Sequence, residues 1–161
     1  MAAKIVQSGV YFIQNVASGT VLDLVGGSDT DGTKVTATTK RELCEQQVAT
    51  QLWVIQLDDN ERDSQPCHIE SAASRTYLDL TNGTSDLICN GLKGRNDDPD
   101  NQWWLITRDS KRTAYVIFNT STKTYVTLKD GKVASGTSVV GASGTGSATT
   151  DTNQLWHIVR A

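Results

Sequence analysis

The sequence contains Ile13-Gln-Asn-Val-Ala-Ser-Gly-Thr-Val-Leu-Asp-Leu24, and the same pattern returns as Ile69-Glu-Ser-Ala-Ala-Ser-Arg-Thr-Tyr-Leu-Asp-Leu80 and as Ile117-Phe-Asn-Thr-Ser-Thr-Lys-Thr-Tyr-Val-Thr-Leu128. Each copy begins with Ile, ends with Leu, and carries Ser or Thr at its sixth position and Thr at its eighth. A second signature follows each copy, as Gln51-Leu-Trp-Val-Ile55, Gln102-Trp-Trp-Leu-Ile106 and Gln154-Leu-Trp-His-Ile158. Two signatures that recur in one order predict a threefold internal repeat of about 50 residues.

Each repeat has the composition of short β-strands separated by turns. In the first repeat, runs rich in Val, Ile, Thr and Phe cover Val10–Asn15, Val21–Leu24, Thr33–Thr38 and Leu52–Leu57, and Ser-Gly, Gly-Gly and Asp-Gly signals lie between them. Four strands in each of three repeats predict an all-β protein of twelve short strands. Only Lys40–Gln47 has a helical composition, over one or two turns. We expect one domain over residues 1–161, with repeats at about 9–57, 66–108 and 114–161.

Three Gln-x-Trp signatures, each preceded by a Thr-x-Leu-Asp-Leu-like strand, resemble the β-trefoil of the ricin B-type lectins. The resemblance covers nearly the whole chain. It is nearest to the fungal, cytosolic members, because the chain shows no secretory signal and no paired cysteines. It implies a carbohydrate-binding protein for galactose- or GalNAc-type glycans, without catalysis or cofactor, that can form a homodimer. A defence role against feeding animals or competitors would follow.

The repeated Trp53, Trp104 and Trp156 are expected to fill the core, and the Gln two residues before each is expected to tie a loop to the backbone. Trp103 differs, because side chains alternate along a strand and its ring should then point away from the core. It could stack on a sugar ring or anchor a partner. However, Leu52 and Leu155 hold the same position in the other repeats, which favours packing.

The resemblance places a sugar-binding carboxylate after the Leu of the second strand. Asp23 and Asp79 stand there, and Thr127 replaces them in the third repeat. Family sites also use an Asn just before the Gln-x-Trp signature, which is Asn101 in the second repeat. Only the second repeat has both residue types together, so it is the first candidate, the first repeat is the second, and the third is expected not to bind. A structural alternative is that each Asp only bonds its own turn.

The third strand of each repeat should supply an aromatic residue that stacks on the sugar, and none is present. The first two repeats instead carry polar residues there, Thr38 and Asn90, which we include as candidate sugar contacts. Three interpretations stay open: the stacking residue comes from elsewhere, such as Trp103 or Tyr77; recognition uses hydrogen bonds alone; or binding has been lost.

Other functions have less support in the sequence. A β-trefoil protease inhibitor is the main alternative, acting through a protruding loop such as Asp58–Cys67 or Leu92–Asp100. Neither His68 nor His157 lies in a recognisable catalytic motif. Asn96–Asn101 could bind calcium, although a solvated loop fits better, and we predict no metal site.

The charge and the cysteine content of the chain restrict the classes of binding partner and the cellular location that we predict. The net charge is −3 and no basic cluster exceeds two residues, which argues against nucleic acid and against a polybasic membrane anchor. No apolar run is long enough to insert into a membrane. Three cysteines without regular spacing predict reduced thiols, each a small buried side chain, and a cytoplasmic location.

Overall fold

The computed structural model describes residues 7–56, 66–92 and 100–161. They form twelve strands: β1 (Gly9–Asn15), β2 (Val21–Leu24), β3 (Thr33–Thr38), β4 (Trp53–Gln56), β5 (His68–Ser71), β6 (Tyr77–Leu80), β7 (Leu87–Asn90), β8 (Trp104–Arg108), β9 (Tyr115–Asn119), β10 (Tyr125–Leu128), β11 (Thr137–Ala142) and β12 (Trp156–Arg160). Short 3₁₀ turns lie at Val25–Gly27, Val48–Gln51, Asp100–Gln102, Lys129–Gly131, Gly146–Ala148 and Thr152–Gln154. These residues contain no α-helix, so the all-β prediction is confirmed.

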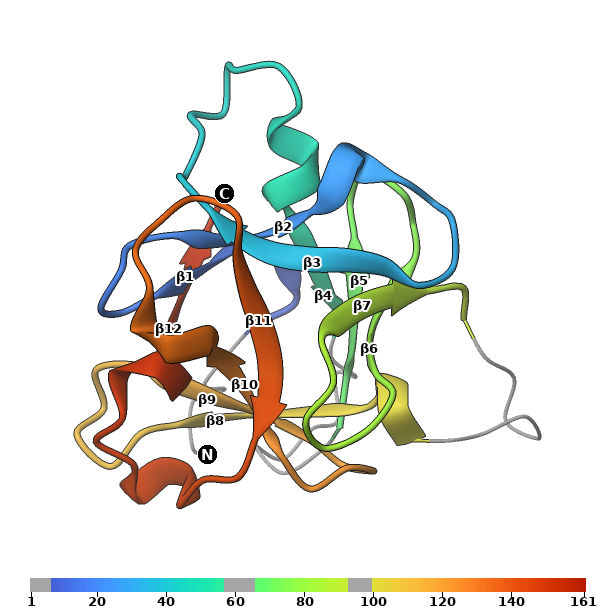
Figure 1. The fold of residues 1–161 in the computed structure, drawn as a ribbon. Helices are drawn as coiled ribbons and strands as arrows, with labels where there is room; N and C mark the ends of the chain where they lie inside the picture. Colours follow the sequence, from blue (N-terminus) through green and yellow to red (C-terminus); the bar gives the residue numbers. More distant parts are fainter. Residues whose placement is uncertain (1–6, 57–65, 93–99) are drawn as a thin grey trace.

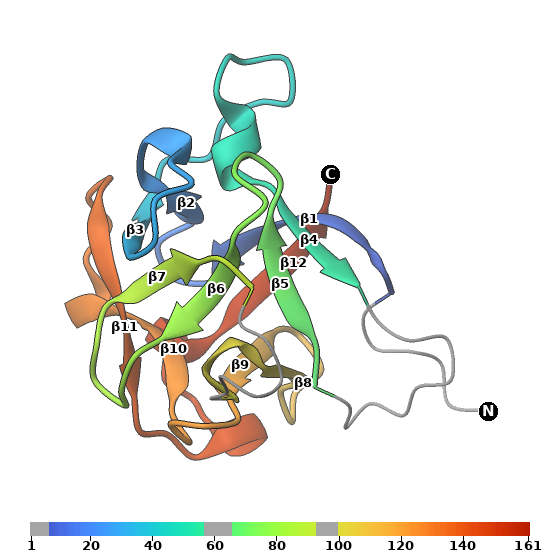
Figure 2. The same ribbon diagram turned by 90° about the vertical axis from the view of Figure 1, so that its right-hand side faces the viewer.

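Six strands close into a barrel. β1 pairs with β4 and β12, β4 pairs with β5, and β9 pairs with β8 and β12, all antiparallel. A bridge between Cys67 and Trp104 joins the start of β5 to β8 and completes the ring. Closure removes the open edges that a sheet would otherwise expose. In Figure 2, β1, β4 and β12 lie to the right of the β2–β3 and β10–β11 hairpins.

The other six strands form one hairpin per repeat, namely β2–β3, β6–β7 and β10–β11. Of these, β3, β7 and β11 lie around the centre of the view in Figure 1. There β3 pairs with both β7 and β11, and a bridge from Asp86 to Val140 links the remaining two hairpins. Each repeat therefore gives two strands to the barrel and two to a three-hairpin cap.

The Ser/Thr positions of the repeated pattern form the turn between its first two strands. The sixth and eighth side chains bond to each other through their hydroxyls, at 2.7 Å for Ser18–Thr20, 2.6 Å for Ser74–Thr76 and 2.8 Å for Thr122–Thr124. The seventh residue has a left-handed backbone, with φ of 71° at Gly19, 64° at Arg75 and 59° at Lys123. Glycine adopts this conformation most readily, and the hydroxyl pair holds it in the two repeats that lack glycine.

The three repeated tryptophans lie in the core, as predicted. Trp53, Trp104 and Trp156 are all fully buried, and each indole Nε1 donates to a backbone carbonyl of the second strand in its own repeat. The acceptors are the oxygens of Leu22, Leu78 and Val126, at 3.1, 3.1 and 3.0 Å. Burial of each ring contributes about 4–6 kcal/mol of transfer free energy.

Two sequence predictions are wrong. The segment Lys40–Gln47 is not helical; a 3₁₀ turn begins only at Val48, after Gln47 adopts a φ of 64°. The segment has no apolar face to pack, because Leu43 is 56% exposed, and so short a helix is unstable without packing. The three cysteines are not joined by disulfides, but Cys44 is exposed and only Cys67 and Cys89 are buried. The described residues include no helix with the length and apolar character that crossing a membrane requires.

Candidate functional site

The candidate site of repeat two is centred on Asp79 in β6. Leu78 and Leu80 of this strand point into the core, so alternation places Tyr77 and Asp79 on its other face. Asp79 Oδ2 accepts a hydrogen bond from Asn90 Nδ2 at 2.8 Å and another from Gln102 Nε2 at 3.2 Å. The structure therefore brings together a carboxylate and two amides from β6, β7 and the turn before β8.

The predicted contacts Asn90 and Asn101 differ in their surroundings. Asn90 is half-buried, and its Oδ1 accepts a hydrogen bond from the backbone N of Gly32 at 2.7 Å, so it also joins the first repeat to the second. Asn101 is buried in the turn Asp100–Gln102, and its backbone oxygen accepts from Asn119 Nδ2 at 2.8 Å. The side-chain amide of Asn90 is therefore held by a backbone contact, whereas Asn101 is held through its main chain.

An aromatic surface adjoins this polar group. Trp103 is 40% exposed, while its neighbour Trp104 is buried, so the predicted outward direction of Trp103 is confirmed. Its ring packs on His68 with centroids 3.8 Å apart, and His68 in turn meets Tyr77 at 5.4 Å in an edge arrangement. Tyr77 faces Asn90 across the β6–β7 pair. The aromatic surface of Trp103, His68 and Tyr77 thus runs from solvent to the polar group.

Two of these rings have shifted acidities. Burial lowers the pKa of His68 below its ordinary value of 6.5, so the imidazole is mainly neutral at pH 7. Burial, together with a hydrogen bond to Glu70, raises the pKa of Tyr77. The aromatic surface is therefore uncharged at neutral pH.

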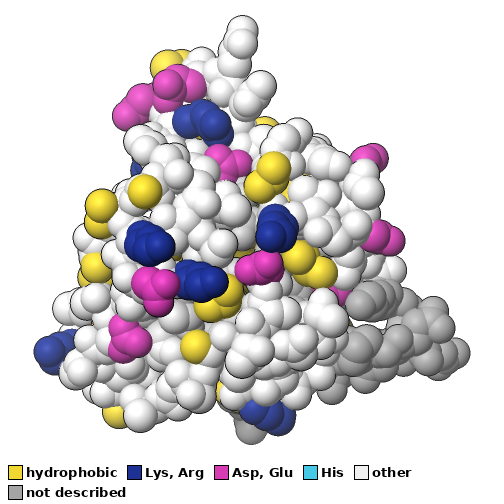
Figure 3. Space-filling model, viewed as in Figure 1, with side chains coloured by type: hydrophobic (Ala, Val, Ile, Leu, Met, Phe, Trp, Pro, Cys, Tyr) yellow, Lys and Arg dark blue, Asp and Glu magenta, His cyan; other side chains and the backbone are white. Residues whose placement is uncertain are grey.

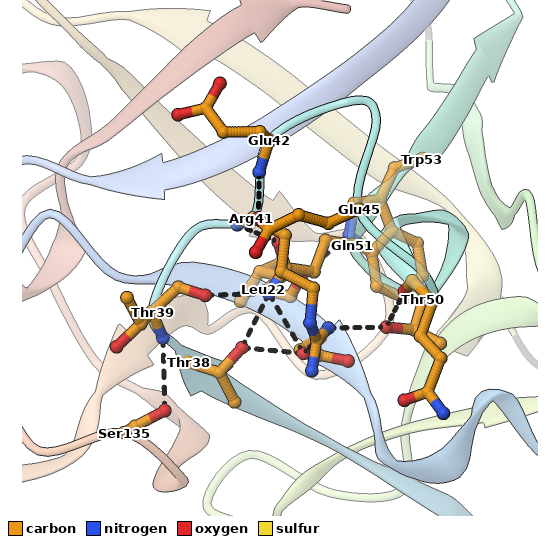
Figure 4. A network of polar contacts seen from close by, with 12 residues as sticks. Leu22, Thr38, Thr39, Arg41, Glu42, Glu45, Thr50, Gln51, Trp53 and Ser135 are labelled. Atoms are coloured by element: carbon orange, nitrogen blue, oxygen red, sulfur yellow. Dashed lines mark hydrogen bonds and ion pairs between the residues drawn. The ribbon is translucent and has the colours of Figure 1, made fainter.

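Repeat one holds its carboxylate differently. Asp23 Oδ2 accepts hydrogen bonds from Thr38 Oγ1 at 2.6 Å and Gln51 Nε2 at 3.1 Å, and it also pairs with Arg41 NH1 at 3.0 Å. The same Arg41 nitrogen donates to Thr50 Oγ1 at 3.2 Å. Figure 4 shows the Arg41 guanidinium lying between Thr38 and Thr50. The predicted pair Asp23 and Thr38 is in direct contact, and an internal cation covers it.

Repeat three has no carboxylate at this position. Thr127 Oγ1 accepts from Gln154 Nε2 at 3.3 Å and itself donates to the backbone oxygen of Tyr125 at 2.9 Å. The glutamine also donates to the oxygen of Ser143 at 2.8 Å. Thr127, Gln154 and Ser143 therefore bond one another, and none of these groups is anionic.

Three features of these sites escaped the sequence reasoning. Gln51 and Gln102 tie loops to the backbone as predicted, through the oxygens of Thr39 and Gly91 at 2.9 Å each, but they also bond the aspartates. In the sequence, Arg41 is only one of two adjacent basic residues, Lys40 and Arg41, and His68 is a histidine outside any catalytic motif. Arg41 comes soon after the third strand of its repeat, and that strand pairs with the strand that carries Asp23. This position was the sequence signal for an ion pair between Arg41 and Asp23.

The surface shows no broad basic region on the face drawn in Figure 3, where Lys and Arg side chains lie close to acidic ones. Lys34 and Asp86 form an ion pair at 3.2 Å. Among residues 7–56, 66–92 and 100–161, no three His, Cys, Asp or Glu side chains gather into a group that could hold a metal ion. Most of the acidic segment 96–101 falls outside these residues.

Comparisons with known proteins agree with this architecture. The sequence matches the family model described as ricin-type beta-trefoil lectin domain-like over residues 4–86 and 49–142. A search of the curated proteins gives no match.

Three similar solved structures illustrate the shared fold. The Rhizoctonia solani agglutinin is 19% identical, with a TM-score of 0.76 over 99% of this chain and all of that one. The Macrolepiota procera ricin B-like lectin in complex with lactose is 22% identical, with a TM-score of 0.71 and the same coverage. The designed threefold symmetric protein ThreeFoil is 23% identical, with a TM-score of 0.75 over 95% of this chain and 99% of that one.

Proposed function

The chain belongs to the ricin-type β-trefoil lectin-like domain family, and from this premise we propose that it is a lectin that binds glycans without altering them. The observation that carries the proposal is the composition of the repeat-two site. There Asp79, Asn90 and Gln102 form a connected polar group, and the exposed Trp103 lies on the aromatic surface beside it. Repeat three lacks the carboxylate, and the carboxylate of repeat one forms an ion pair with Arg41.

The chemistry of these groups suits sugar hydroxyls. A carboxylate accepts hydrogen bonds only, asparagine both donates and accepts, and charge assistance about doubles the strength of each bond to a carboxylate. The flat apolar face of a sugar ring can pack on Trp103 or Tyr77. These rings take the place of the third-strand aromatic residue that the sequence lacks.

The proposed ligand is a galactose- or GalNAc-ended glycan. This preference comes from the family resemblance, and a similar structure was solved with lactose, which has a galactose end. Asp79 is only 1% exposed, so a sugar hydroxyl reaches its carboxylate only after neighbouring side chains move. The free energy of this rearrangement weakens binding. We expect millimolar affinity for a monosaccharide, about −4 kcal/mol.

The test is a glycan array probed with the wild type, Asp79→Asn and Asn101→Ala. Asn153→Ala is the matched control, because Asn153 holds the equivalent position in repeat three. We expect galactose-ended glycans to bind the wild type and the control, and to lose binding in both repeat-two variants at unchanged Tm. A large fall in Tm for Asp79→Asn would instead identify a structural turn aspartate, and a blank array from folded wild type would contradict the lectin proposal.

Weak single sites make multivalency important. A homodimer would present two repeat-two sites and raise the overall affinity by avidity without any new contact. Agglutination of galactose-bearing cells, with the oligomeric state measured by light scattering, tests this; a monomer that still agglutinates would contradict it.

The comparisons give no support to the protease-inhibitor alternative. The loops proposed for it lie mostly in residues 57–65 and 93–99, outside the described residues.

A further inference from the structure

Arg41 occupies repeat one at the place where a ligand would lie. Its NH1 atom is 3.0 Å from Asp23 Oδ2 and 3.2 Å from Thr50 Oγ1. Asp23 and Thr50 stand at the sequence positions that Asp79 and Asn101 hold in repeat two. One guanidinium nitrogen of Arg41 thus bridges Asp23 and Thr50. The equivalent residues of repeat two are proposed to contact the sugar.

We infer that Arg41 is an internal occupant of repeat one and decides which repeat of this lectin binds a sugar. The inference rests on the proposed function. The two distances are those of ordinary hydrogen bonds, so NH1 stands where a bridging sugar hydroxyl would donate. An ionised donor bonds a carboxylate more strongly than a neutral hydroxyl does, and Arg41 is covalently part of the chain. A neutral sugar therefore competes poorly for Asp23.

The backbone around Arg41 is also held in place. Its backbone N donates to Gln51 Oε1 at 2.8 Å, and Gln51 Nε2 donates to the oxygen of Thr39 at 2.9 Å. The N of Thr39 donates to Ser135 Oγ at 3.1 Å, which anchors the segment to the third repeat. Because the segment is held at Thr39 and at the backbone of Arg41, the guanidinium starts from a fixed backbone position next to Asp23. Its side chain is 33% exposed, so the occupant lies at the mouth of the site.

The four indole N–H groups offer a separate reporter for each repeat. Trp53 Nε1 donates to the oxygen of Leu22, the residue before Asp23, while Trp104 Nε1 donates to the oxygen of Leu78, the residue before Asp79. A two-dimensional ¹H–¹⁵N spectrum, assigned by single Trp→Phe changes, therefore distinguishes binding at repeat one from binding at repeat two. Lactose and N-acetylgalactosamine are the titrated probes.

The variants are Arg41→Ala and Arg41→Ser, each compared with Arg160→Ala, which removes the same charge from an exposed site in β12. Two replacements are used so that one misfolded variant does not end the test, and Tm is measured for each. We expect the Trp53 signal to move with sugar only in the Arg41 variants. Affinity at repeat one should rise by at least about tenfold over the wild type. Adding Asp23→Asn should abolish this response.

The possible results separate this inference from the proposed function. A sugar-dependent shift of the Trp53 signal in the wild type would overturn the role of Arg41. The same conclusion would follow if Trp53 did not shift in folded Arg41 variants whose Trp104 signal responds. Both results would leave the proposed repeat-two site standing. A Trp53 response in the Arg41 variants with Trp103 and Trp104 silent would support Arg41 and overturn the repeat-two site. Silence of all four indoles in every folded variant would overturn both.

Discussion

Gln102 donates a hydrogen bond from Nε2 to Asp79 Oδ2 at 3.2 Å, and the same nitrogen donates to the backbone oxygen of Gly91 at 2.9 Å. The glutamine that marks the fold in the sequence therefore also positions the carboxylate of the candidate site. Gln154 makes the matching bonds in repeat three, to Thr127 Oγ1 and to the oxygen of Ser143. Structure and function can be separated by changing the two glutamines in parallel.

Replacement of either glutamine by alanine should destabilise the protein, but only one should affect binding. Gln102→Ala and Gln154→Ala each remove one buried and one partly buried hydrogen bond, which should lower the free energy of unfolding by about 1–3 kcal/mol. Urea denaturation measures this loss. In a glycan-binding assay, Gln102→Ala should lose most of the signal and Gln154→Ala should keep it. Equal loss of binding in both variants would contradict a site confined to repeat two.

The adjacent tryptophans of repeat two should respond very differently to truncation. Trp104 is fully buried and donates to Leu78, so Trp104→Ala should cost about 3–5 kcal/mol of stability. Trp103 is 40% exposed and packs mainly on His68, so Trp103→Ala should cost less than about 1 kcal/mol while weakening glycan binding. Guanidinium unfolding and a binding titration check the pair. A stability loss at Trp103 as large as that at Trp104 would show that its ring is a core element.

The sequence predicted what depends on local pattern and repetition. The strands, the buried Trp53, Trp104 and Trp156 and the outward Trp103 follow from alternation and from the recurrence of each signature. The segment Lys40–Gln47 could not be predicted, because its path depends on bonds from Arg41 to Gln51 and Asp23 rather than on a helical repeat.

The connected site likewise lay beyond the sequence. His68 and Trp103 meet only because β5 and the start of β8 are neighbours in the barrel. Asn90 was chosen for its place in the repeat; its bond to Asp79 follows from the register of the β6–β7 hairpin, whereas its bond to the N of Gly32 depends on how this hairpin packs against the first repeat. Side-chain partners that come from different repeats are set by tertiary structure.

The three thiols should differ in reactivity. Cys44 is exposed, whereas Cys67 and Cys89 are buried, so a bulky aromatic disulfide reagent should modify one thiol in the native protein and three after unfolding. Absorbance of the released thiolate counts the modified groups. Cys44→Ser is the control and should abolish the native reaction. Rapid native modification of Cys67 or Cys89 would show that the barrel or the β6–β7 hairpin opens readily.

Burial of Cys89 predicts a loss of stability in alkaline solution. Burial raises the pKa of this thiol from 9.0 to about 12, with a smaller contribution from nearby Asp79, against the lowering effect of a hydrogen bond with Thr76. Between about pH 9 and 12 the unfolded thiol loses its proton while the folded one keeps it. The unfolded state then binds fewer protons, so this contribution to stability is complete below about pH 9 and is lost as pH rises toward 12.

The matched variant for this effect is Cys89→Ala, which has no thiol to titrate. Lysine and tyrosine side chains also titrate in this range, but they do so in both proteins, so the difference between the two stability profiles isolates Cys89. Urea unfolding at pH 8 and pH 10 should show the wild type losing about 1 kcal/mol more than the variant. Parallel profiles would mean that the thiol ionises as easily in the folded protein as in the unfolded chain, and that the interior around β7 admits water.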